Sequence, residues 1–236
     1  PRQKHRHPCR YNGARLAALH EGRRRPSETG LVATRSSGTA GSVQARSVPA
    51  MKAPAEITTA RLVLRRPVAS DAEEIFKRYA SDASVCRYLA WPIHTTVADT
   101  RAFLEFSDQA WEQWPAGPYL IFSKDTRTLL GSTGFSFETL GRASIGYVLA
   151  RDSWDKGFAT EATQAMKHVA AQVGADELFA CCHPDHQPSR RVLEKCGFAE
   201  QRSLHRRCEF PNLAPGKMLV AVCYVWTAKL EQGKRH

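Results

Sequence analysis

After Met51, apolar and polar positions follow the periods of short strands and amphipathic helices. Residues 61–65 alternate as Arg-Leu-Val-Leu-Arg, which predicts a strand that ends at Pro67. Ser70 and Glu73 have the spacing of a capping box, so a first helix is predicted to begin there.

A second helix and three strands are predicted next. Large apolar residues recur at steps of three and four between Thr96 and Pro115, which is typical of an amphipathic helix. Three apolar runs separated by short polar turns then predict an antiparallel meander with strands at residues 119–124, 129–137 and 143–150.

The following segment alternates helices and strands. A helix with one apolar stripe is predicted from about Phe158, and Gly174 fits the position just after its end. Residues 178–182 have the composition of a buried strand. Pro188 suits the first turn of a short helix that is predicted to end at Gly197.

Residues 218–226 form a near-continuous apolar run, which suits a central strand of a sheet. The predicted order is therefore β-α-α-β-β-β-α-β-α-β-β, an α/β fold with mixed strand directions. The strand–helix–strand passage from Tyr147 to Cys182 is expected to be a right-handed parallel crossover.

Most of the net charge lies before residue 51. Residues 1–50 contain ten Lys and Arg and two Glu, which is +8 of the formal net charge of +11. Because they lack apolar periodicity, we expect a disordered basic arm, followed by one domain over residues 51–236. Met51 is the first methionine, so we expect the native protein to start there; an organellar transit peptide and a nucleic-acid-binding arm are the alternatives.

Cysteine usage and hydropathy indicate the cellular compartment in which the protein is expected. The seven cysteines form no CxxC pair, and several lie within apolar runs, as is typical of buried thiols in a reducing compartment. No run of about 18 apolar residues is present, so no membrane-spanning segment is predicted. We therefore expect a cytoplasmic protein with no membrane partner, and the small charge of its body makes a nucleic-acid partner an unfavoured interpretation.

The junction between residues 145–150 and the helix at Phe158 carries the strongest chemical signal. Gly157 and Ala159 are small residues in a turn that ends a strand and opens a helix. The free backbone N–H groups and the dipole of such a helix start attract a pyrophosphate, and the hydroxyl of Thr160 adds a donor. The spacing alone supports equally well a pyrophosphate site and a glycine whose only role is to permit a tight turn.

This junction resembles a motif of the GNAT acetyltransferases. Gly-Tyr-Val-Leu at residues 146–149 and Trp-Asp-Lys-Gly-Phe-Ala-Thr-Glu-Ala at residues 154–162 are similar to the cofactor motif of the Rim-type branch, the ribosomal-protein N-terminal acetyltransferases. Residues 57–65 and 186–198 resemble the opening strand and the last motif of that branch. The resemblance spans roughly residues 57–230.

The resemblance implies a mostly antiparallel central sheet with helices on both faces and a splayed parallel strand pair that binds acetyl-coenzyme A. It implies no metal. It places the cofactor on these residues: Val148, Leu149, Trp154, Asp155, Lys156, Gly157, Phe158, Ala159, Thr160, His186 and Ser189. Trp154, Asp155 and His186 depart from the usual Gln or Arg, Gly and Asn.

The chemistry implied is direct attack of an amine on the thioester. The backbone N–H of Leu149 is the candidate oxyanion donor, and Ser189 is the candidate acid for the departing thiolate. Tyr147 is the second candidate acid. The alternative roles are helix-end packing for Ser189 and core packing for Tyr147. We name no base, because Ser144 stands where the branch has Glu.

Other carboxylates and thiols are less convincing catalytic groups. Glu138, Glu105 and Asp108 fit solvated surface positions. Cys181 and Cys182 are adjacent on a strand and so point to opposite faces, which disfavours a metal site shared with His183 and His186. A Cys–His acyltransferase would need a third, orienting group that the sequence does not reveal.

The acceptor is expected to be a primary amine. Residues 88–93 lie between the two early helices, which line the acceptor groove in this family, and they are apolar. This favours a protein N-terminus or a small neutral amine over polycationic amines. A coenzyme A-binding sensor or scaffold without turnover, and a nucleic-acid-associated protein, are the competing hypotheses, and either a monomer or a homodimer fits.

Overall fold

The computed structural model describes residues 51–228, so the predicted basic arm lies outside the described residues. The strands are β1 (Glu56–Thr58), β2 (Leu62–Arg65), β3 (Pro118–Ser123), β4 (Leu129–Thr139), β5 (Arg142–Leu149), β6 (Glu177–Cys182), β7 (Ala199–Glu200), β8 (Arg206–Glu209) and β9 (Met218–Thr227). The helices are η1 (Ala69–Asp71), α2 (Ala72–Ile75), η2 (Phe76–Ala80), α3 (Ala83–Cys86), α4 (Val97–Gln113), η3 (Arg151–Ser153), α5 (Phe158–Gln172), α6 (Gln187–Lys195) and η4 (Arg202–Leu204).

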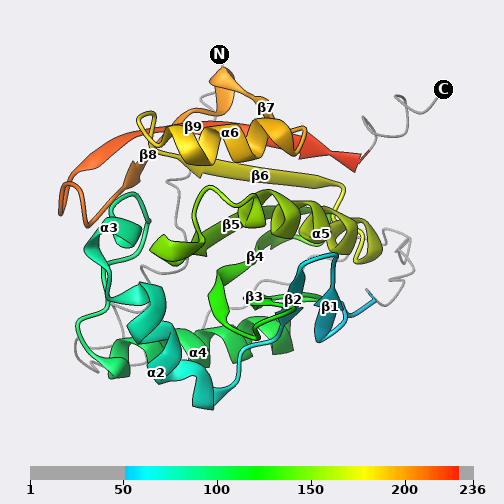
Figure 1. The fold of residues 1–236 in the computed structure, drawn as a ribbon. Coiled ribbons are helices and arrows are strands. Elements are labelled where there is room, and N and C mark those ends of the chain that lie inside the picture. Colours follow the sequence, from blue (N-terminus) through cyan, green and yellow to red (C-terminus); the bar gives the residue numbers. More distant parts are fainter. Residues whose placement is uncertain (1–50, 229–236) are drawn as a thin grey trace, which may run out of the picture.

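The strands form one sheet in the order β1-β2-β3-β4-β5-β6-β9-β7, and β8 also pairs with β9 (Figure 1). Every neighbouring pair is antiparallel except β5 and β6. The predicted mixed, mostly antiparallel sheet is confirmed. The apolar run at residues 218–226 is β9, which lies between β6 and β7 and is a central strand as predicted.

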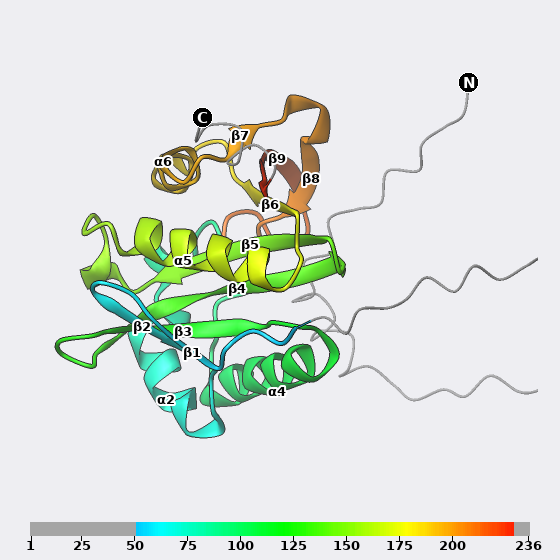
Figure 2. The same cartoon turned by 90° about the vertical axis from the view of Figure 1, so that its right-hand side faces the viewer.

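Helices cover both faces of the sheet, with α5 and α6 on one face and α2 and α4 on the other (Figure 2). Successive side chains of each strand point to opposite faces of the sheet, so one strand contributes to both core layers. Leu62 and Leu64 of β2 join the core cluster under α5, whereas Val63 joins the cluster under α2 and α4. In β5, Ile145 and Leu149 face α5, and Val148 faces the opposite layer.

The longer helices begin and end at the predicted residues. Thr96 is the N-cap of α4, which ends before Pro115. α5 starts at Phe158 after the N-cap Gly157, and Gly174 follows its C-cap in the left-handed region with φ 78°. Glycine suits both positions because it has no Cβ to clash at positive φ.

The predicted capping box at Ser70 and Glu73 is wrong. The side chain that caps this segment is Asp71, whose carboxylate accepts a hydrogen bond of 2.7 Å from the N–H of Val68. Arg65 holds the same carboxylate with two bonds of 2.9 and 2.6 Å. Asp71 is buried and Glu73 is exposed, and the helical segment begins at Ala69 with Val68 as its N-cap, so the cap lies two residues before Ser70.

Four short elements were given no residue range from the sequence: β1, α3, β7 and β8, which have two to four residues each, although the predicted order has one strand between the last helix and residues 218–226, where β7 and β8 lie. No helix between residues 51 and 228 is long and apolar enough to cross a membrane. Five of the six cysteines in this range are buried, and Cys181 is half-buried, in agreement with the expected packing of thiols within apolar runs.

Candidate active site

The parallel strands β5 and β6 separate partway along their length. They pair at only three positions, from Arg142 with Glu177 to Ser144 with Phe179. Beyond this point β5 continues beside β4 as far as Leu149, while β6 continues beside β9 as far as Cys182. The edge of β5 that faces β6 is therefore open from residue 145 onward, and the predicted splay is confirmed.

The open edge of β5 presents alternate backbone groups. The N–H of Ala150 bonds the carbonyl of Leu130 in the segment of β4 at 2.8 Å. Because successive amides of a strand point to opposite sides, the N–H of Leu149 points to the open edge. A Cβ added at Gly131 of β4 would collide with the carbonyl oxygen of Val148, so that carbonyl faces β4. Of the two residues predicted to bond the cofactor arm, Leu149 has its amide on the open side.

The turn between β5 and α5 gathers unpaired amide donors. Among the described residues, no hydrogen bond engages the N–H groups of residues 155–160, and the first helical bond runs from Glu161 to the carbonyl of Gly157 at 3.1 Å. Asp155 and Gly157 have positive φ values of 56° and 79°, which turn the chain sharply. Consecutive amides in such a turn form a concave anion-binding site at the positive end of the helix dipole. The predicted residues Lys156, Phe158, Ala159 and Thr160 all lie in this turn or in the first turn of α5.

Trp154 lies at the start of this turn. Its indole N–H donates to the carbonyl oxygen of Leu149 at 2.8 Å. This bond ties the turn to the end of β5 and leaves Trp154 without a donor for an anion. The exposed part of Trp154, 41% of its surface, is available for the predicted contact with the cofactor.

Ser189 and Tyr147 meet at the splay. The hydroxyl of Tyr147 on β5 lies 3.0 Å from the hydroxyl and 3.0 Å from the carbonyl oxygen of Ser189 on α6. Burial raises the pKa of Tyr147 well above its usual value, against a smaller lowering by Ser189, so its phenol stays protonated. Burial raises the pKa of the Cys182 thiol on β6 to about 11, against smaller lowering effects of Arg190 and Ser189. The two candidate acids thus form one hydrogen-bonded pair.

His186 caps α6. Its Nδ1 accepts the N–H of Ser189 at 3.2 Å, which requires an unprotonated Nδ1. Burial is the main cause that lowers the pKa of His186, so the neutral ring is favoured. In this form Nε2 carries the proton and can donate a hydrogen bond. The residue that departs from the family pattern therefore positions Ser189 through the backbone.

An aromatic wall stands beside His186. The ring of Tyr88 stacks on His183 with centroids 5.2 Å apart and meets the edge of His186 at 4.9 Å. Phe210 meets His183 at 5.2 Å. Tyr88 belongs to the segment predicted to line the acceptor groove, whereas Phe210 was not found from the sequence, because it lies far along the chain in the connection from β8 to β9.

Asn212 in the same connection fixes this segment. Its side-chain N–H groups donate to the carbonyl oxygens of Cys86 and Trp91, both at 2.8 Å, and its oxygen accepts the N–H of Ile93 at 2.7 Å. These three bonds use both N–H donors and the carbonyl oxygen of the side-chain amide. No sequence signal identified Asn212, since its partners are more than 100 residues away.

The carboxylates considered as bases take part in surface ion pairs or are exposed. Asp108 bonds Arg66 at 2.8 Å, and Glu138 bonds Arg142. Glu105 is exposed on α4. Ser144 donates to the carbonyl of Ser136 at 3.3 Å. Within residues 51–228, no group of three or more His, Cys, Asp or Glu could hold a metal ion.

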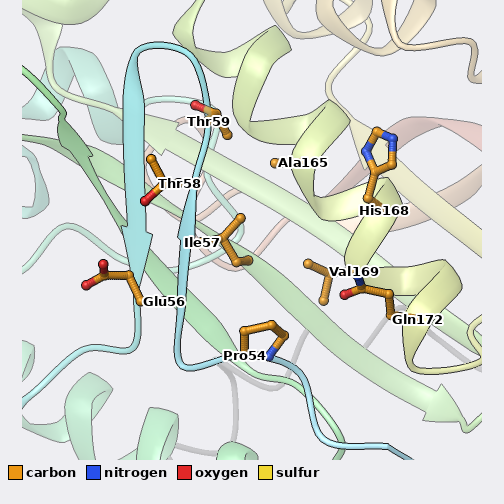
Figure 3. A pocket seen from close by; sticks show the side chains of 9 residues that line it. All are labelled: Pro54, Glu56, Ile57, Thr58, Thr59, Ala165, His168, Val169 and Gln172. Atoms are coloured by element: carbon orange, nitrogen blue, oxygen red, sulfur yellow. The ribbon is translucent and has the colours of Figure 1, made fainter.

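A separate hollow of about 280 Å³ lies between the β1–β2 hairpin and the flank of α5 (Figure 3). Ile57 and Val169 give it an apolar floor, and Thr59 and His168 lie at its rim. None of the residues that line it was predicted as a site residue. The hollow does not coincide with the amide turn or with the Tyr147–Ser189 pair.

Comparisons with known proteins agree with this architecture. The protein-family model described as the acetyltransferase (GNAT) domain matches residues 61–199. The N-acetyltransferase p20 of Bacillus licheniformis is 30% identical over 146 residues, which cover 61% of this chain and 82% of that protein. The N-acetyltransferase YoaA of Bacillus subtilis is 27% identical over 162 residues, which cover 67% and 90%.

Two solved structures share the fold. A GNAT acetyltransferase from Bacillus anthracis superposes with a TM-score of 0.62 at 24% identity, over 74% of this chain and 99% of that chain. RimL, a ribosomal-protein alpha-N-acetyltransferase solved in complex with coenzyme A, superposes with a TM-score of 0.62 at 20% identity, over 73% and 97%. Because the matched domain spans more than half of the sequence, this chain belongs to the GNAT family and is an acyltransferase.

Proposed function

We propose that this acyltransferase moves an acetyl group from acetyl-coenzyme A to a primary amine. The observation that carries the proposal is the run of unpaired amides at residues 155–160, placed at the end of a strand whose edge is open from residue 145. The amides hold the pyrophosphate, and the open edge receives the pantetheine arm through Leu149. A structural neighbour was solved with coenzyme A bound, which supports this choice of donor.

The transfer needs a donor for the oxyanion and a proton for the leaving thiolate. In this proposal the N–H of Leu149 stabilises the oxyanion that forms when the amine attacks the thioester carbonyl. The hydroxyl of Ser189 gives its proton to the thiolate sulfur, the phenol of Tyr147, 3.0 Å away, restores the proton of Ser189, and water returns a proton to Tyr147. Neutral His186 holds the backbone of Ser189 in place.

The acceptor is proposed to be a protein N-terminus. Asp108 and Glu138 form ion pairs and Glu105 lies exposed on α4, so in this proposal the attacking amine loses its proton to water. An α-amino group has a pKa near 8, so about a quarter of it is neutral at pH 7.5, against about one part in a thousand for a lysine-like amine. The aromatic wall of Tyr88 and Phe210 suits an apolar first side chain.

An amine panel tests this proposal. The acceptors are a peptide with a free N-terminus, the same peptide with a blocked N-terminus and a free lysine, a polyamine and an aminoglycoside. Release of the coenzyme A thiol is followed in a colorimetric thiol assay, and mass spectrometry locates the acetyl group. We expect turnover with the free N-terminus and at most traces with the blocked peptide. Faster transfer to the polyamine would overturn the choice of acceptor.

A catalytically weak coenzyme A-binding scaffold is the second candidate. The carboxylate of Asp155 lies in the turn that receives the anion, and Ser144 stands where the resemblance implies Glu. This candidate predicts coenzyme A binding without thiol release for any amine in the panel.

We also propose that residues 51–236 form one domain and that the protein is cytoplasmic.

A further inference from the structure

Arg61, in the turn that leads into β2, is fixed across the start of α5. Its backbone N–H and its Nε donate to the two oxygens of Glu161 at 2.8 and 2.7 Å. Its Nη1 donates to the carbonyl oxygen of Lys156 at 2.9 Å. Two bonds from the guanidinium and one from the backbone therefore hold Arg61 beside the amide turn, although about 100 residues separate the two segments.

The remaining nitrogen of Arg61 faces the turn. Within the described range, no hydrogen bond engages its Nη2, and this atom lies 3.4 Å from where a Cβ at Gly157 would be. The guanidinium carbon also lies 4.9 Å from the centre of the Phe158 ring. The side of Gly157 that a side chain would occupy is thus covered by a donor with spare hydrogen-bonding capacity.

Arg61 also offsets an unfavourable charge. Glu161 lies in the first turn of α5, close to where a phosphate would bind. Burial raises the pKa of Glu161, but hydrogen bonds from Thr59 and Arg61 outweigh this effect and lower it, so the carboxylate is ionised. Without Arg61 this charge would repel an anion at the same helix start.

Neighbouring cations have other partners. Arg78 bonds Asp152 at 2.9 and 2.8 Å, and Arg151 lies 3.8 Å from Asp82. The charged groups around the turn are therefore largely matched in pairs, with Lys156 exposed in the turn itself. Arg61 differs from these arginines because it is anchored to the turn and still presents an N–H toward Gly157.

We propose that Arg61 is a phosphate-binding residue of the acyl donor's nucleotide end. This inference rests on the proposed function, because it assumes that the turn receives coenzyme A. A guanidinium is well suited to the role, since its planar fork bonds an anion and a carboxylate on different edges. The phosphate is either the pyrophosphate or the ribose 3′-phosphate, and the experiment separates the two.

Calorimetry with coenzyme A and with 3′-dephospho-coenzyme A provides the test. The variants are Arg61→Ala, Glu161→Gln and the double variant, with thermal melts for each. Arg66→Ala is the matched control, because the Arg66 side chain is 38% exposed against 50% for Arg61 and forms an ion pair with Asp108 on the other layer. The two arginines are partly exposed, so their ion pairs contribute little to folding, and Glu161→Gln keeps a hydrogen-bonding side chain of the same size, so all variants should fold.

We expect Arg61→Ala to weaken coenzyme A binding about tenfold, the lower range for a charge-assisted hydrogen bond. The double variant should also bind coenzyme A about tenfold more weakly than Glu161→Gln does. Arg66→Ala should bind coenzyme A like the unaltered protein. An equal loss for both ligands assigns the pyrophosphate, and a loss for coenzyme A alone assigns the 3′-phosphate.

Two results would overturn the inference. If the double variant binds coenzyme A as tightly as Glu161→Gln, Arg61 only neutralises Glu161 and does not contact phosphate. If Arg61→Ala binds like the unaltered protein, Arg61 has neither role while the proposed function stands. Failure of the unaltered protein to bind coenzyme A would instead overturn the proposed function and this inference together.

Discussion

Replacing Ser189 with alanine removes one hydroxyl from the centre of the proposed acyl-transfer site. The phenol of Tyr147 keeps the carbonyl oxygen of residue 189 as its acceptor at 3.0 Å. Nδ1 of His186 keeps the N–H of residue 189, because that bond uses only the backbone. No buried polar group loses its last partner, so the free energy of unfolding should fall by at most about 1 kcal/mol.

The effect on turnover should be much larger. General acids contribute about 10²- to 10⁴-fold, and a water molecule in the place of the hydroxyl can partly replace the lost acid. We therefore expect kcat for Ser189→Ala to fall by about 10- to 1000-fold, which is about 1.4 to 4 kcal/mol in the barrier. Coenzyme A affinity should be nearly constant, since the amides of residues 155–160 lie on a different helix.

A double-mutant cycle with Tyr147→Phe tests whether the two hydroxyls act as one relay. Initial rates are measured from released thiol with a peptide acceptor, and melting curves accompany each variant. If the phenol acts through Ser189, Tyr147→Phe should lower kcat in the unaltered protein but have little effect in the Ser189→Ala background.

Several outcomes would contradict this reasoning. Unchanged kcat in Ser189→Ala would leave Ser189 as a helix-start residue and would place the proton donor elsewhere. A parallel loss of coenzyme A affinity would make Ser189 a binding residue. Additive effects of the two substitutions would show that the hydroxyls act independently, despite the 3.0 Å that separates their oxygens.

The remaining predictions concern folding and pH. Gly131→Ala should lower the free energy of unfolding by about 2 to 4 kcal/mol, because its Cβ meets the Val148 carbonyl, whereas Gly141→Ala, with nothing within 4 Å, should change it by less than about 0.5 kcal/mol in denaturant melts. Because the pKa of His186 is lowered on folding, its contribution is complete above about pH 6.5 and is lost as pH falls, so a pH series of melts should show less acid loss for His186→Asn. Asn212→Ala removes three hydrogen bonds and should raise KM for the acceptor severalfold with little change in coenzyme A affinity; an unchanged KM would contradict its role in fixing the groove.

The central elements could be predicted from the sequence because their patterns are long. α4, α5 and β9 have 17, 15 and 10 residues, enough for a helical or strand period to show. β7 has two residues, and β1 has three, so no period can be recognised in them. The failed capping box has a different cause, because the ion pair between Arg65 and Asp71 depends on how β2 meets the helix.

The candidate site was only partly predictable. The turn at Gly157 has a local signature, and Ser189 and Tyr147 could be named individually from the family resemblance. Their contact could not, because it depends on how far β6 and α6 move away from β5. Gly157 also has a second partner that no local pattern reveals, the guanidinium of Arg61.

The edge of β5 that loses β6 as its partner after residue 144 has a consequence for amide hydrogen exchange. Ala150 bonds β4 through its N–H, and Val148 faces the same way, so these two amides should exchange slowly with solvent deuterium. Tyr147 and Leu149 point to the open edge and should exchange faster. One continuous strand would then show exchange rates that alternate with a period of two, and a ligand bound along this edge would slow only every second amide.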